Sequence, residues 1–213
     1  MKIWKAHYKD EHHDLDIDII NTEEEYGTNP LSFQIGDYRF VGTSIGDFEL
    51  ENPQLYGQAK KQFHIIKCGS YSNEYYYKLQ RYYMDVYLPI PVLKKIDYSL
   101  FTGILHIIFE YKEHNIEKKQ AIIKMDDKRI YLDDEIVYNF SLTIGNEHFY
   151  INKKNEKQQE LSLYFESNLL KLSKRIQEKY RFQCCFTCQY SDYSPYGNDD
   201  YGSMLCYKKH KQE

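Results

Sequence analysis

Apolar and polar residues alternate along roughly the first 150 positions of the chain. Residues 14–19 read Asp-Leu-Asp-Ile-Asp-Ile, a period of two that predicts a strand with one solvated face. Two more alternating segments flank Gly36-Asp37 and predict a hairpin over residues 31–42. Other predicted strands fall within residues 62–68, 75–88, 101–111, 120–124, 128–132, 135–140 and 148–151. Many short strands without intervening helices indicate an antiparallel sandwich or open barrel, and we predict an antiparallel β-sandwich over residues 1–152.

The pattern changes after the charged segment at residues 153–157, which reads as a turn or linker. From residue 160 the apolar positions have the spacing of one helical face, at Leu161, Phe165, Leu169, Leu172 and Ile176. Cations gather toward the end of this segment, where they complement a helix dipole. We therefore predict one amphipathic helix within residues 153–181, packed on the sandwich and leading into a tail at residues 182–213. The fold class is mainly β (α+β).

The tail holds four of the five cysteines of the chain. A Cys-x-x-Cys pair followed by Cys-x-x-x-His is the spacing of a tetrahedral zinc site, and the predicted ligands are Cys185, Cys188, Cys206 and His210. The alternative is that these thiols pack around an aromatic tail without metal. Cys184 adjoins Cys185, and because neighbouring side chains on an extended chain point apart, only one of the two can join the turn with Cys188. We predict Cys185, in a closed structural zinc knuckle.

Residues 190–197 carry turn-forming residues between tyrosines. Ser, Asp, Pro and Gly in this tract fix the backbone, so the segment is predicted to be a rigid loop. Its predicted partner-binding residues are Asp192, Tyr193 and Tyr196. The alternative is that the tyrosines cover the small core of the knuckle itself.

Composition and charge narrow the classes of function. The net charge is -4 with acids and bases interspersed, which disfavours general nucleic-acid binding. The 23 tyrosines fit either a β-rich domain or an aromatic contact face. Without an apolar leader or a membrane-spanning stretch, the protein is predicted to be cytoplasmic, with no membrane partner. Residues 10–14 read as a solvated hairpin turn rather than a metal site. Catalytic residues are not assigned, because the usual catalytic motifs are missing from the sequence.

The tail residues 185–197 and 201–206 resemble the signature of a bacterial family catalogued as domain of unknown function 6304. Residues 32–49 and 88–91 resemble the amino-terminal half of the same family. The resemblance implies no established activity. Members of the family continue past the third cysteine, which leaves His210 either as a substitute ligand or as no ligand. The family is similar in genomic style to the immunity proteins that accompany bacterial toxins, which implies binding and blocking.

Two classes of function follow from these patterns. The first is a cytoplasmic protein-binding module, an immunity or anti-toxin factor that uses an acidic, tyrosine-rich face against a basic toxin. The second is a metal-dependent hydrolase or nucleic-acid-acting enzyme centred on the tail cysteines, which would require an open metal position. A third, weaker alternative is an RNA contact through the zinc knuckle. We predict the protein-binding module.

Overall fold

The computed structural model describes residues 1–22, 30–69, 75–112, 135–151, 165–184, 191–193 and 204–206. The chain forms two compact units, one made of Met1–Asp85 with Ile108–Ile136 and the other of Val86–Ile107 with Val137–Glu213. Each unit is described separately below. The predicted division of the chain at residues 152 and 181 stays a prediction.

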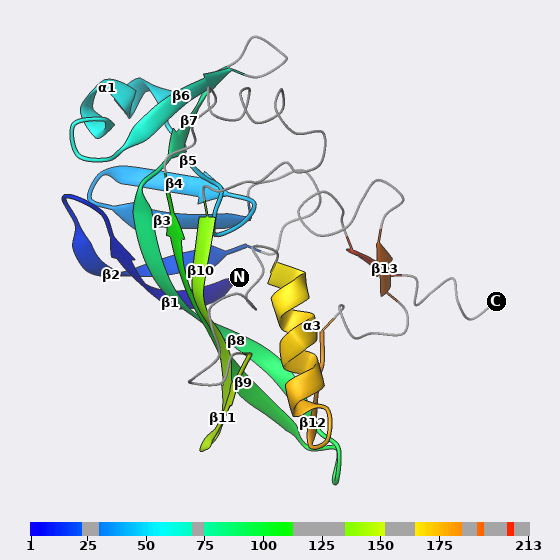
Figure 1. Ribbon diagram of the computed structural model, residues 1–213. Helices are drawn as coiled ribbons and strands as arrows, with labels where there is room; N and C mark the ends of the chain where they lie inside the picture. Colours follow the sequence, from blue (N-terminus) through cyan, green and yellow to red (C-terminus); the bar gives the residue numbers. More distant parts are fainter. Residues whose placement is uncertain are drawn as a thin grey trace, which may run out of the picture. The chain divides into compact units, whose positions relative to one another are not determined.

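The first unit begins with an antiparallel series of short strands (Figure 1). The strands are β1 (Lys2–Lys9), β2 (Asp14–Asn21), β3 (Leu31–Ile35), β4 (Tyr38–Gly42), β5 (Phe48–Leu50), β6 (Ile65–Gly69) and β7 (Tyr75–Leu79). A 3-10 turn, η1 (Pro53–Leu55), and the short helix α1 (Tyr56–Ala59) connect β5 to β6. Three longer strands have residues in both units: β8 (Tyr82–Lys94), β9 (Leu100–Tyr111) and β10 (Glu135–Ile144).

Alternation places an aromatic core on one face of the first unit. Tyr8, Phe33, Phe40 and Tyr82 are almost completely buried. The ring of Phe33 lies 5.1 Å from that of Phe40, and the ring of Tyr8 lies 5.9 Å from that of Tyr82, measured between centroids. Rings at these separations add to the free energy of burial, so this cluster contributes to the stability of the unit.

The predicted hairpin over residues 31–42 is present as β3 and β4, paired from Leu31 with Gly42 to Ile35 with Tyr38. Its turn depends on Gly36, which has a φ of 57°, a conformation that glycine adopts at little cost. The predicted strand at residues 14–19 is present as β2, which pairs with β1 along all eight residues.

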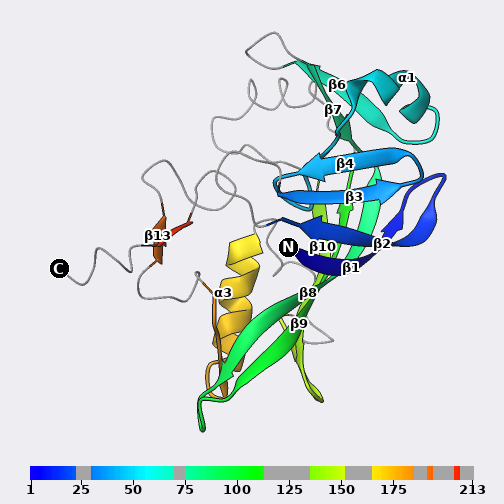
Figure 2. The ribbon, with the colours of Figure 1, turned by 180° about the vertical axis from the view of Figure 1, so that it is seen from behind.

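The second unit contains β11 (Glu147–Tyr150), α3 (Phe165–Ile176), β12 (Tyr180–Phe182), β13 (Ser191–Tyr193) and β14 (Met204–Cys206). Figures 1 and 2 show α3 beside β12 from two opposite directions. The predicted helical stripe is confirmed where it is described, because Leu169, Leu172 and Ile176 are buried. Leu161 lies outside the described residues. Close packing also explains Gly103, where a Cβ atom would lie 2.9 Å from Leu142 Cδ1 and 3.1 Å from Val92 Cγ2.

The fold is mainly antiparallel β, as the alternating pattern predicted, and its strands form an open sheet. The predicted sandwich stays a prediction. Hydrogen-bonded neighbours follow the order β11-β10-β9-β8-β1-β2-β3-β4-β5-β7-β6, and β12 pairs with β8. The strands β13 and β14 form a separate two-stranded sheet. In the part of the chain that is described, no helix is long and apolar enough to cross a membrane.

Candidate functional site

Most of the predicted zinc site lies outside the described residues, namely Cys185, Cys188 and His210. Cys206 is the last residue of β14, and its backbone pairs with Ser191 of β13. Cys184 is partly buried and forms no disulfide within the described residues. Among the residues that the structure describes, no group of three or more His, Cys, Asp or Glu side chains could hold a metal ion. The zinc ligand set therefore stays a prediction.

The predicted contact loop is described only in part. Asp192 and Tyr193 belong to β13, where they pair with Leu205 and Met204 of β14. Tyr196 lies outside the described residues. The antiparallel pairing brings the backbone of the tyrosine-bearing tract beside the strand that ends in Cys206, although the two are separate in the sequence.

The acidic stripe of β2 is paired with cations on β1. Lys5 Nζ lies 2.7 Å from Asp18 Oδ1, and Lys9 Nζ contacts Asp14. Between them the His7 ring bridges two carboxylates, with Nδ1 at 2.8 Å from Asp16 and Nε2 at 2.8 Å from Asp14. The hydrogen bond with Asp16 is the largest cause of a raised pKa for His7; burial opposes it, and the contact with Asp14 adds to it. Because Asp14, Asp16 and Asp18 are paired with Lys5, His7 and Lys9, their negative potential is largely compensated, which weakens the attraction of a basic partner.

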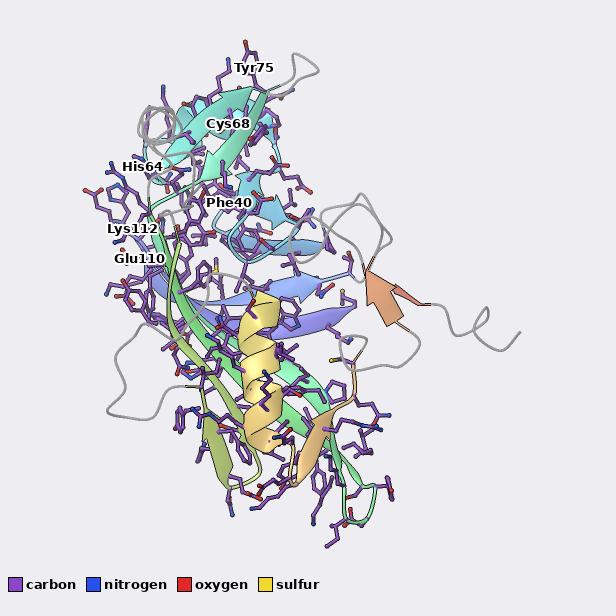
Figure 3. All side chains as sticks on the ribbon, turned by 45° about the vertical axis from the view of Figure 1, so that its right-hand side comes forward. Phe40, His64, Cys68, Tyr75, Glu110 and Lys112 are labelled. Atoms are coloured by element: carbon purple, nitrogen blue, oxygen red, sulfur yellow. The ribbon has the colours of Figure 1, made fainter. Side chains whose placement is uncertain are left out.

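Cys68 lies on the β6–β7 hairpin, close to Tyr75 (Figure 3). Its thiol is partly buried rather than fully buried as a small apolar residue would be. Burial, partly opposed by a contact with the Tyr76 hydroxyl, raises the pKa of the Cys68 thiol. Since the thiolate is the reactive form, Cys68 is a poor nucleophile.

The turn between β8 and β9 and the first two residues of β9 expose four large apolar side chains within six residues. The exposed fractions are 83% for Ile96, 76% for Tyr98, 63% for Leu100 and 42% for Phe101. We call these four residues the hairpin tip. Exposed apolar side chains that are single are ordinary on protein surfaces, whereas a contiguous group of them marks a contact surface.

Hydrogen bonds hold the backbone of this turn in place. Lys94 N donates to Ser99 O at 2.9 Å, and the Asp97 carboxylate accepts from Ser99 N at 3.0 Å. The turn is also attached to the segment after α3, because Lys95 N donates to Lys179 O at 2.9 Å and Lys95 Nζ donates to Gln177 O. The hairpin tip is thus presented by an ordered turn, which reduces the entropy lost on binding.

Tyr98 adopts a backbone conformation that large side chains avoid. Its φ is 57°, in the left-handed region, where a non-glycine residue costs about 1–2 kcal/mol. The exposed ring gains little packing in return. A bulky residue kept in a strained and exposed position is typical of a site with a function.

An aromatic and apolar strip continues from the tip along one face of β8 and β9. Leu100, Ile104 and His106 are spaced by even numbers on β9, so they share a face. Tyr87 stacks on the His106 ring, with centroids 4.4 Å apart and planes within 7°. Asn139 on β10 donates to His106 O at 3.0 Å, which fixes the neighbouring backbone. Tyr87 and Ile104 are both exposed, so they enlarge the surface beyond the turn.

Residues 2–191 match the model of a family described as a family of unknown function (DUF6304). The chain belongs to this family. No curated protein and no solved structure matches the chain. The matched range ends at residue 191, so it includes Cys185 and Cys188 and only the first part of the tail signature. Membership in DUF6304 assigns no activity, and the function of this member must be argued from its surfaces.

Sequence reasoning did not find the hairpin tip. The segment Ile-Asp-Tyr-Ser-Leu-Phe at residues 96–101 leads into the predicted strand at residues 101–111, and it contains four apolar residues. Turns are usually built from polar residues, glycine and proline, so an apolar turn was the available signal. The predicted contact face lay instead on the tail loop.

Proposed function

We propose that this member of DUF6304 is a protein-binding module whose hairpin tip inserts into an apolar hollow on a protein partner. The observation that carries this proposal is the exposure of four large apolar side chains on a turn held by hydrogen bonds at both ends. Tyrosine is among the residues that most often dominate binding free energy, particularly when a surrounding ring of contacts excludes water.

The size of the tip sets what the partner must add. At the exposed fractions observed, complete burial of the four side chains contributes about 4–8 kcal/mol, based on roughly 1.5–3 kcal/mol for each fully exposed side chain. Association itself costs about 4–15 kcal/mol in lost freedom. The tip therefore acts as an anchor, and a stable complex also needs contacts along the strip that contains Tyr87 and Ile104.

The biological role that we propose is that of an immunity or anti-toxin factor acting in the cytoplasm. Binding that covers a toxin surface needs a rigid, apolar anchor and no chemistry of its own, which fits the turn described above. In this proposal the body is an antiparallel sandwich. The tail is a small knuckle with structural zinc on Cys185, Cys188, Cys206 and His210, and Asp192, Tyr193 and Tyr196 form a second contact loop. The pairing of β13 with β14 supports the idea that the tail is an ordered unit.

The proposal is tested with the double variant Ile96→Ser/Leu100→Ser. The protein encoded by the adjacent reading frame is expressed alone, with the wild-type chain and with the variant, and survival and co-purification are measured. We expect wild type to restore growth and co-purify, and the variant to lose at least about tenfold in affinity, which corresponds to 1.4 kcal/mol.

The matched control is Leu170→Ser, which replaces an exposed apolar residue on α3. It should protect and co-purify like wild type, and thermal unfolding should show that both proteins remain folded. Equal growth with and without the wild-type chain would reject the immunity role. Co-purification of the tip variant at the wild-type level would reject the tip as the contact surface.

A further inference from the structure

Tyrosine and lysine side chains follow one another across α1, β6 and β7 of the first unit. Figures 1 and 2 show α1 next to β6 and β7 from two opposite directions. The Tyr56 ring of α1 contacts the Tyr77 ring of β7, with centroids 4.4 Å apart. Tyr77 pairs with Lys67 of β6, whose Nζ lies 3.6 Å from the centroid of the Tyr75 ring. At the other end, Lys60 Nζ lies 5.4 Å from the centroid of the Tyr56 ring. We call these five residues the tyrosine–lysine strip.

The strip is open to solvent at its two cations and at its outermost ring. Lys60 and Lys67 are exposed, and Tyr75 is 58% exposed. Figure 3 shows Tyr75 towards the end of the pair formed by β6 and β7. A ring with this exposure is not enclosed between two neighbours, so a further planar group can stack on it. Tyr56 and Tyr77 are partly buried against each other, which fixes the other end of the strip.

The segments that carry the strip have no acidic residues. Residues 52–69 and 75–84 contain neither Asp nor Glu, and Glu74 lies outside the described residues. In the described part of the chain, Lys60 and Lys67 contact aromatic rings and are not paired with a carboxylate. A lysine over a ring keeps its full charge, because the ring attracts the cation without neutralising it.

The carboxylates in and beside β5 belong to other contacts. Asp47 lies 3.0 Å from Lys78, and Glu51 forms an ion pair with Arg39. Glu49 is opposite Lys78 in the β5–β7 ladder. Because successive residues of a strand face opposite sides of the sheet, Glu49 and Lys78 do not share the face of the strip. The local potential over the strip is therefore positive, although the whole chain has a net charge of -4.

An exposed ring beside lysines is the combination that binds single-stranded nucleic acid. A base of any sequence can stack on an aromatic ring, while ammonium groups pair with the phosphates of the backbone. A duplex presents phosphates but keeps its base faces stacked inside the helix, so it would use the lysines alone. An acidic peptide would likewise use the lysines and leave the ring without a partner. The chemistry of the strip therefore favours a single strand over both.

We propose that the tyrosine–lysine strip binds a short single strand of nucleic acid. A base stacks on the Tyr75 ring, and Lys60 and Lys67 pair with phosphates along the strip. Stacking and phosphate pairing are common to RNA and DNA, so the strip does not distinguish between them. Two lysines give a small field, so binding is weak and sensitive to salt, in keeping with the acidic charge of the whole chain. The strip belongs to the first unit, and its ligand goes beyond the protein-binding function proposed above.

The test measures the fluorescence anisotropy of dye-labelled oligonucleotides titrated with the full-length protein. The probes are oligo(dT) and oligo(U) of about eight nucleotides, within the roughly 4–16 that one binding fold covers, and a hairpin duplex of similar length. We expect both single strands to saturate with a Kd of about 100 µM or lower in 50 mM salt, and the duplex to bind at least about fivefold more weakly. For two phosphate contacts, the logarithm of the binding constant should fall with the logarithm of salt concentration at a slope of about -1.4.

Tyr75→Leu is the decisive variant, because it removes the ring and keeps an apolar side chain at an exposed position. It should weaken oligo(dT) at least about fivefold, which corresponds to about 1 kcal/mol. Tyr76→Leu is the matched control, since Tyr76 is also exposed and lies on the opposite face of the same strand. This control should bind like wild type, and thermal unfolding should show that both variants remain folded.

Lys67→Gln tests the charge of the strip. It should make the salt slope shallower by about 0.7, the contribution of one phosphate contact. Lys174→Gln changes the net charge equally at an exposed lysine of the second unit, and it should leave the slope unchanged.

Four results would each overturn the proposal. They are failure of both single strands to saturate, duplex binding as tight as that of oligo(dT), wild-type affinity in Tyr75→Leu, and competition by polyglutamate as effective as that by unlabelled oligo(dT). The last would show that the lysines bind acidic chains by charge alone. None of these measurements involves the hairpin tip, so their outcome is independent of the test of partner binding.

Discussion

Replacing Tyr98 with glycine should stabilise the protein while it weakens partner binding. The tyrosine has a φ of 57°, and its ring is 76% exposed, so its side chain contributes little burial. Glycine removes a left-handed strain of about 1–2 kcal/mol. It also adds about 0.4–1 kcal/mol of unfolded-state entropy, which opposes the gain. The expected change in the free energy of unfolding is therefore a gain of about 0–1.5 kcal/mol.

Tyr98→Ala is the matched comparison, because alanine removes the same ring but keeps a Cβ at positive φ. Urea unfolding of the three proteins gives the free energies, with a common slope as the check that the unfolded states are comparable. The glycine variant should be more stable than the alanine variant by about 1 kcal/mol, which is the backbone effect alone. In the co-purification assay both variants should lose affinity to the same extent, since both lack the ring.

Either of two results would refute this reasoning. A glycine variant that is less stable than wild type by more than about 1 kcal/mol would mean that the Tyr98 ring packs in the folded protein. Partner affinity equal to wild type in both variants would mean that the strained tyrosine has no role in binding. A gain in stability together with a loss of affinity is the combination that a functional residue under strain predicts.

Three other predictions concern the ion pairs between β1 and β2, the core of the second unit and the tail. His7 has a raised pKa, so its ion pairs stabilise the protein below pH 6.5 and lose that contribution as the pH rises through the raised value. The loss should be below about 1 kcal/mol because the site is exposed, and His7→Gln should remove this part of the pH dependence in urea unfolding between pH 5.5 and 8.5. Gly103→Ala should destabilise by about 1–3 kcal/mol in the same assay, because the new methyl group overlaps Leu142, and wild-type stability would contradict the close packing. For the tail, metal analysis should find one zinc per chain in the wild type and less in Cys185→Ser, whereas equal zinc content in both would remove Cys185 from the ligand set.

The strands and the helix could be predicted because their signals are local. The period of two at residues 14–19 corresponds to β2, since alternation alone decides which side chains face the core. The stripe through Leu169, Leu172 and Ile176 predicted α3 in the same way. The turn at residues 10–14 was also expected, and Asp10 N donates to His13 O there at 2.9 Å. The turn was predicted to be solvated, and this was wrong for Asp10, because its side chain is only 5% exposed and accepts hydrogen bonds from neighbouring residues.

The surfaces could not be predicted because they depend on contacts between distant residues. The turn that carries the hairpin tip is hydrogen-bonded through Lys95 to Gln177 and Lys179, which only the folded chain brings near it. A cavity in the first unit is lined by Lys9, Arg81 and Lys112, which are far apart in the sequence. The ion pairs between β1 and β2 could be predicted in part. Residues 4–9 also alternate, and a hairpin closed at residues 10–13 sets Lys5 opposite Asp18, so this pairing was available from the sequence.

The attachment of the turn to the segment after α3 has a consequence for the order of events during synthesis. Lys95 and its acceptor Gln177 are 82 residues apart. At a translation rate of about 5–20 residues per second, the ribosome needs about 4–16 s to add the acceptor after it has added the lysine. A nascent chain therefore displays the four apolar side chains on a turn that has its own hydrogen bonds but lacks the attachment to Gln177 and Lys179 until those residues have been added. Premature capture of a partner by an unfinished chain is disfavoured by this delay.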